Sequence, residues 1–330
     1  MNRHERRKLK GKGIENSRFF NDLSKAIEVH QSKNFSEAEK IYKKLLKTHQ
    51  ESYELNRHLG ILYQDIGKTP DSFEYFVKCI KKNPNGFEAY NNMGTSYVLV
   101  KDYQLAVKCF NKSVSISNDY LPAINNLANL YSRRGDGENS LKYAKILMKK
   151  DPDNPNVIST YAKALILNHE IDMAINLMEE LVKKNNNNEE FQLNLATAYR
   201  ESGEFKKSKK IVDTNFKKLF EMRMQGSPVK NLIQFFSQFA SDKTNKLTDQ
   251  EINFFYKRLK SNELTTDQKI TLSKGFFEYF KNIKDYEKSY ENLAAMNELC
   301  YSLETYDTEK DRIFFNKLAQ NIKYPNITYS

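Results

Sequence analysis

The 330-residue sequence contains little glycine, proline or cysteine, with 11 Gly, 7 Pro and 3 Cys. Few turn residues and no stretch of alternating apolar and polar residues argue against an all-β fold. The cysteines Cys79, Cys109 and Cys300 form no CxxC pair. Cys79 and Cys109 fall on apolar helix faces, so we expect small core residues in a reducing compartment.

Long apolar runs are also missing. No segment reaches the roughly 18–20 apolar residues that a membrane-spanning helix needs. The N-terminus, Met1 to Gly13, is basic but has no apolar stretch after it, so it does not read as a secretory signal. We therefore expect a cytoplasmic protein.

Catalytic and metal-binding motifs do not occur in the sequence. There is no HExxH, no GxSxG, no glycine-rich dinucleotide turn and no phosphate loop. The histidines have no metal-ligand spacing; they are His4, His30, His49, His58 and His169. The sequence predicts a protein that is not an enzyme and that uses no cofactor or metal.

What the sequence does contain is a period of 34 residues. A small residue recurs at this interval: Ala26, Gly60, Gly94, Ala128, Ala162 and Ala196. Twelve residues after each comes a second small residue: Ala38, Ser72, Ala106, Ser140, Ala174 and Ser208. A fixed period of this length is typical of a solenoid, in which each unit must stack on the next to bury its apolar face.

One unit shows the packing that this pattern predicts. Tyr90, Met93, Gly94 and Tyr97 have the spacing of one helical face, and residues from Leu105 onward mark a second helix. The series Tyr-Asn-Asn-Met-Gly-Thr-Ser-Tyr over 90–97, with Asn-Pro at 83–84 and Asp-Pro at 151–152, resembles the tetratricopeptide repeat (TPR). The resemblance implies an all-α TPR solenoid, a right-handed superhelix of helix–turn–helix repeats.

The expected organisation has three parts. Residues 1–18 form a basic disordered tail, and residues 19–222 form six repeats that start near 19, 53, 87, 121, 155 and 189. Residues 223–330 form an atypical C-terminal helical cap. We predict its helices near 229–241, 248–260, 265–282, 285–302 and 307–321. Gly275 and Ser289 mark one degenerate repeat-like unit, and their separation of 14 residues predicts a longer turn there.

The net charge of +11 comes from two segments. Residues 1–18 have a net charge of +5 and residues 205–230 have +6, so the remainder is neutral. Such segments can contact nucleic acid or an anionic membrane surface. We favour a solubilising tail and a solvated helix face, because no aromatic residues interleave with the basic ones as a nucleic-acid platform requires.

The candidate site is the groove that the resemblance implies along the first helix of each repeat. Asparagine is a mediocre helix former, so its recurrence there needs a reason. Its amide offers both a donor and an acceptor, which matches a peptide backbone. A column of such amides is similar to the asparagine ladder in the TPR groove of O-linked N-acetylglucosamine transferases. The alternative is that Asn is simply common in this chain. The candidates are Asn91, Asn92, Asn125, Asn126, Asn129, Asn194, His58, Arg57 and Thr160.

We expect these side chains to face solvent and to bind an extended segment of a protein or peptide partner. A second known groove chemistry, the clamp that binds C-terminal carboxylates, is rejected. Ile61 and Pro122 stand where that clamp has polar or basic groups.

The C-terminal part has a further resemblance. Lys274-Gly275, the segment over 285–290 and Tyr306-Asp307 look like the link between TPRs and the catalytic domain of bacterial TPR-sulfotransferases. The phosphate loop of that family is not found in this sequence. Two hypotheses follow: a non-enzymatic scaffold that binds proteins, or the substrate-presenting half of a sulfotransferase-like system.

Overall fold

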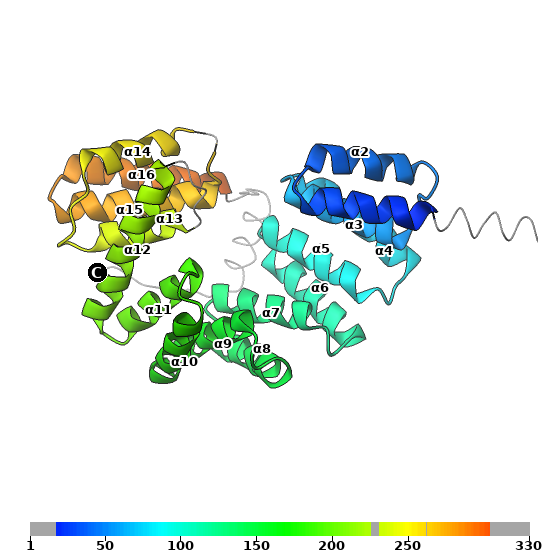
Figure 1. Cartoon of the computed structure of the whole chain (residues 1–330), viewed down its shortest axis with the longest axis horizontal. Coiled ribbons are helices and arrows are strands. Elements are labelled where there is room, and N and C mark those ends of the chain that lie inside the picture. The colour runs from blue at the N-terminus through cyan, green and yellow to red at the C-terminus, as the bar shows by residue number, and fades with distance from the viewer. Residues whose placement is uncertain (1–17, 226–230, 262, 304–330) are drawn as a thin grey trace, which may run out of the picture. The chain divides into compact units, whose positions relative to one another are not determined.

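The structure, a computed structural model, describes residues 18–225, 231–261 and 263–303. Every regular element in these ranges is a helix, and no strand occurs in them (Figure 1). The prediction of an all-α fold is confirmed. Residues 1–17 of the basic tail and the helix predicted near 307–321 lie outside the described residues.

The helices follow one another in pairs over most of the chain. A helix over 18–31 is followed by α2 (Phe35–Leu46), α3 (Tyr53–Asp65), α4 (Thr69–Lys82), α5 (Phe87–Leu99), α6 (Tyr103–Ile116), α7 (Leu121–Arg133), α8 (Gly137–Lys150), α9 (Pro155–Leu167) and α10 (Ile171–Lys184). The series continues with α11 (Glu189–Glu201), α12 (Phe205–Met224), α13 (Leu232–Ser241), α14 (Asp249–Leu259), α15 (Thr266–Asn282) and α16 (Tyr286–Leu303).

The turn inside each pair has the same backbone conformation. A left-handed residue, with φ between 62° and 84°, recurs every 34 positions: Lys33, Gly67, Lys101, Gly135, His169 and Gly203. Three of these are not glycine, and each such residue costs about 1–2 kcal/mol in that conformation. The packing of the two helices against each other fixes the turn and offsets this cost.

Small residues let the two helices of a pair approach closely. A Cβ atom added to Gly94 would lie 2.6 Å from Cε1 of Phe110, and one added to Gly60 would lie 2.5 Å from the same atom of Phe76. Both phenylalanines are fully buried. The small positions that define the period therefore serve to seat these rings.

The chain divides into two compact units, with the boundary between Leu181 and Val182. The sixth predicted repeat, α11 and α12, groups with the C-terminal helices rather than with the repeats before it. The reason is a shared aromatic core, in which Phe216 and Phe220 of α12 join Phe235, Phe236 and Phe255. The repeat boundaries near 19 and 222 remain predictions.

Within residues 231–261 and 263–303, four further helices of the second unit lie where the sequence predicts them. α13 packs against α12 and α15, and α15 pairs with α16 (Figure 1). The longer turn expected in this last pair is wrong. The hydroxyl of Ser289 donates to the carbonyl of Phe277, twelve residues away, as Ser208 does to Ala196. Lys284 takes the left-handed position. The turn is therefore the common one, and Phe277, not Gly275, occupies the small-residue position.

Candidate functional site

The predicted site residues lie on the first helices of successive pairs. Arg57 and His58 are on α3, Asn91 and Asn92 on α5, and Thr160 on α9. Asn125, Asn126 and Asn129 are on α7. These four helices contact one another in order, α3 with α5, α5 with α7 and α7 with α9, within the first unit (Figure 1). We call the surface that carries these eight residues the candidate face. Asn194, on α11, belongs to the second unit.

Amides on the candidate face hydrogen-bond across neighbouring repeats. The Nδ2 group of Asn126 donates to Oδ1 of Asn91 over 2.9 Å. The hydroxyl of Thr160 donates to Oδ1 of Asn125 over 3.1 Å. Asn91 and Thr160 are buried, at 6% and 8% exposure. The expectation that all of these side chains face solvent is therefore wrong, because the first helices stack closely enough for the side chains to reach one another.

The other amide side chains form fewer hydrogen bonds to neighbouring repeats. Asn129 donates to the backbone carbonyl of Asn125 in its own helix over 3.0 Å. Asn92 is half-buried, and its Nδ2 group has no hydrogen-bond partner within the described ranges. Asn126 is also half-buried. The Nδ2 group of Asn92 is itself buried, and that of Asn126 already donates to Asn91, so these two half-buried amides can offer a ligand only their acceptor oxygens.

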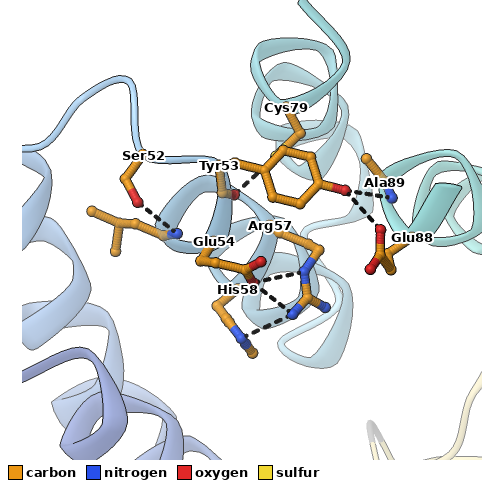
Figure 2. A network of polar contacts seen from close by, with 9 residues as sticks. Ser52, Tyr53, Glu54, Arg57, His58, Cys79, Glu88 and Ala89 are labelled. Atoms are coloured by element: carbon orange, nitrogen blue, oxygen red, sulfur yellow. Dashed lines mark hydrogen bonds and ion pairs between the residues drawn. The ribbon is translucent and has the colours of Figure 1, made fainter. Parts of the chain in front are cut away.

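A polar network holds α3 in place (Figure 2). The Arg57 guanidinium donates to Oε2 of Glu54 over 2.9 Å and to Nε2 of His58 over 3.3 Å. One turn earlier in the same helix, the hydroxyl of Tyr53 donates to Glu88 of α5 over 3.2 Å. Arg57 is consequently occupied by groups of its own helix.

The same network accounts for Cys79. Its thiol donates to the backbone carbonyl of Tyr53 over 3.3 Å (Figure 2). Burial raises the pKa of this thiol to about 12, and burial raises that of Cys109 to about 11. A thiol with such a pKa is protonated at neutral pH and a poor nucleophile. Both residues therefore fit the predicted packing role.

A cavity of about 420 Å³ opens on the candidate face between the helix over 18–31 and α3. Its walls include Ile27, His30, Phe35, His58, Ile61 and Asp65. Of these, the sequence singled out only His58 as a site residue. Ile27 and Ile61 hold the position that Asn129 and Thr197 hold in later repeats. An apolar residue at this position in two successive repeats was the signal that could have revealed the cavity.

The histidines and the aspartate of the cavity are neutral or paired, and the exposed Gln31 and Lys33 complete its lining. Burial, followed by the nearby Arg57 guanidinium, lowers the pKa of His58 to about 4. Its imidazole is therefore uncharged at neutral pH. Nε2 of His30 donates to Asp65 over 2.9 Å, and its Nδ1 lies 3.4 Å from the Tyr42 hydroxyl. An apolar side chain with an adjoining uncharged polar group is the ligand that this arrangement suits.

Among residues 18–225, 231–261 and 263–303, no group of three or more His, Cys, Asp or Glu side chains is placed to hold a metal ion. No helix in the same ranges is long and apolar enough to cross a membrane.

Comparison with known proteins identifies the fold. Residues 87–120 match the family model of the tetratricopeptide repeat. The tetratricopeptide repeat-containing protein trd-1 of Caenorhabditis elegans is 23% identical over 130 residues. The match covers 39% of this chain and only 17% of that protein's length.

Solved structures agree with this assignment. A tetratricopeptide repeat protein from Parabacteroides merdae is 12% identical with a TM-score of 0.60, over 78% of this chain and 98% of that one. A chain of the APC/C hetero-tetramer Cut9–Hcn1 is 13% identical with a TM-score of 0.55, over 82% of this chain and 48% of that one. At these identities the likeness concerns the fold, which is an all-α TPR solenoid.

Proposed function

We propose that this chain is a non-enzymatic scaffold that binds an extended segment of a partner protein along the candidate face. The observation that carries the proposal is the cavity between the first two repeats, with the apolar side chains of Ile27 and Ile61 beside the uncharged His58. An apolar side chain of the partner fills this cavity, and the half-buried amides of Asn92 and Asn126 bind the backbone of the same segment.

Two general observations support a role in protein binding. Solenoids of short repeats present extended surfaces that are used for partners more often than for chemistry. The structurally similar Cut9–Hcn1 assembly is a hetero-tetramer, so a protein of this fold there assembles with another protein. A cytoplasmic location is part of the proposal, since Cys79 is a buried free thiol and Cys109 a half-buried one.

The test is selection of binding peptides from a random library on the purified chain, followed by titration of the selected peptides. Ile61→Lys places a charge in the cavity and should weaken binding about tenfold or more. Asn92→Ala with Asn126→Ala should cost about 1–3 kcal/mol of binding free energy.

The matched control is Ile146→Lys on α8, an exposed isoleucine on a second helix. It should leave the affinity unchanged. Selected peptides that bind equally to the wild type and to Ile61→Lys would mean that the binding surface lies elsewhere.

The sulfotransferase hypothesis rests on the sequence resemblance alone. Sulfonate transfer that requires this chain together with a separate enzyme would favour it.

A further inference from the structure

We propose a second binding surface, in the second unit, for an acidic segment of a partner protein that carries an aromatic side chain. The surface consists of the exposed lysines of α12, the loop over 242–247 and the cavity between them. It goes beyond the proposed function, because it uses different helices and a different chemistry.

The cationic part of this surface lies on α12, which at 20 residues is longer than the other second helices. Lys206, Lys210 and Lys217 are exposed and share one helical face by their spacing of four and seven residues. They extend over about 16 Å of the helix. In the part of the chain that the structure describes, none of them forms an ion pair.

A second segment brings more positive charge beside this helix. The Nδ2 group of Asn245 donates to Oδ1 of Asp213 over 2.9 Å, which fixes the loop over 242–247 against α12. Lys243 and Lys246 of this loop are exposed. Lys209 forms ion pairs with two carboxylates that also line the cavity, Asp213 at 2.7 Å and Asp242 at 3.7 Å. The exposed lysines of α12 and of the loop outnumber these carboxylates, so the surface is positive overall.

A cavity of about 370 Å³ lies between the helix and the loop. Val212 forms an apolar wall, and Phe205 stands at the cavity with 66% of its surface exposed. Gln238 and Thr244 add polar groups, and Arg200 adds a further cation. An exposed phenylalanine beside an apolar wall suits an aromatic side chain, which gains both burial and ring packing there.

These features favour an acidic peptide over single-stranded nucleic acid. Nucleic-acid binding of that kind needs a series of exposed aromatic rings on which successive bases stack. This surface offers one exposed ring and one cavity. A peptide with a single aromatic residue flanked by Asp and Glu matches one cavity whose lining includes Arg200, Lys209 and Lys243, with further exposed lysines on the same helix.

The experiment titrates the full chain with a labelled peptide of alternating Glu and Asp around a central Tyr. Binding should weaken as the ionic strength rises from about 0.05 to about 0.5 M. Lys206→Glu with Lys210→Glu should reduce the affinity about tenfold, because two attractive pairs become repulsive. Phe205→Ala should reduce it severalfold, and so should replacement of the peptide's Tyr by Ser.

The matched control is Lys145→Glu with Lys149→Glu on α8, two exposed lysines with the same spacing and the same change of charge. It should leave the affinity unchanged. An equal loss in both double variants would show only a nonspecific effect of net charge and would overturn the proposal. It would also be overturned if an oligothymidylate bound more tightly than the peptide, or if Phe205→Ala had no effect.

Discussion

An asparagine in a helix is costly unless its amide finds partners, and the candidate face shows where the partners come from. The side chain of Asn91 is buried and accepts from Asn126 of the next repeat, and Asn125 accepts from Thr160 in the same way. Donor and acceptor in one short side chain suit a contact between two stacked helices. The recurrence of Asn thus has a structural cause in the third to fifth repeats, in addition to the proposed contact with a ligand.

Asn91→Ala should lower the free energy of unfolding by about 1–3 kcal/mol, since it removes a buried amide and leaves its partner unpaired. Asn176→Ala is the matched control, because Asn176 is exposed within α10. That variant should be neutral or slightly stabilising, as Ala is the better helix former. Chemical denaturation of both variants measures the difference. Equal stability of the two would mean that the link between repeats contributes nothing.

His58 should make stability depend on pH. Its pKa is lowered to about 4 in the folded protein, and an unperturbed histidine has a pKa of about 6.5. Between these values the unfolded chain binds a proton that the folded protein does not. The stabilising contribution of the neutral imidazole is complete above pH 6.5 and is lost as the pH falls toward 4. The loss amounts to roughly 3 kcal/mol at most.

Denaturation of the wild type and of His58→Gln between pH 7.5 and pH 4.5 tests this expectation. The wild type should lose stability more steeply than the variant as the pH falls, because glutamine does not titrate. Parallel pH profiles would contradict the assignment and would place the titrating groups elsewhere.

At the scale of the elements, each repeat depends on a small residue between its two helices and on a left-handed residue in its turn. The sequence shows the first more clearly than the second. The small residue that lets the helices approach is visible as a period, and the structure gives Gly94 and Gly60 that role. The left-handed turn residue is visible only where it is glycine. At Lys33, Lys101 and His169 nothing in the residue type indicates the conformation. The same limitation caused the error at Ser289, since Gly275 resembled the marker while Phe277 held its position.

Gly94→Ala should destabilise the protein by about 1–2 kcal/mol. The strain of overpacking is larger than the gain in helix propensity, and this figure is the difference between the two. The added methyl group would meet the Phe110 ring at 2.6 Å. Phe110→Leu removes that ring edge, so the double variant should lose less stability than the sum of the two single variants. A double-mutant cycle by denaturation measures this coupling. Strict additivity would show that the helices separate without resistance from the ring.

For the whole molecule, sequence periodicity predicts the helices well because each repeat contacts mainly its neighbours. It predicts the grouping of repeats poorly. The sixth repeat has the same 34-residue pattern as the others. Its Phe216 on α12 nevertheless packs in the core of the second unit, where its ring centroid lies 4.4 Å from that of Phe239 on α13. Long-range packing of this kind has no period and leaves no pattern along the chain. The position of Lys243 and Lys246 beside α12, which depends on the contact between Asn245 and Asp213, was missed for the same reason.

The two units should therefore respond separately to a damaged core. Phe255 is fully buried, and its ring centroid lies 4.1 Å from that of Phe236, so Phe255→Ala should cost about 3–5 kcal/mol in the second unit. Because repeat proteins are stabilised by local and nearest-neighbour contacts, amide hydrogen exchange should accelerate in α13 to α15 while α5 to α8 keep their protection. Phe110→Ala, a buried phenylalanine of the first unit, is the reciprocal variant and should show the opposite pattern. Equal acceleration in both regions in either variant would mean that the chain unfolds as one cooperative body, and the division after Leu181 would then have no energetic meaning.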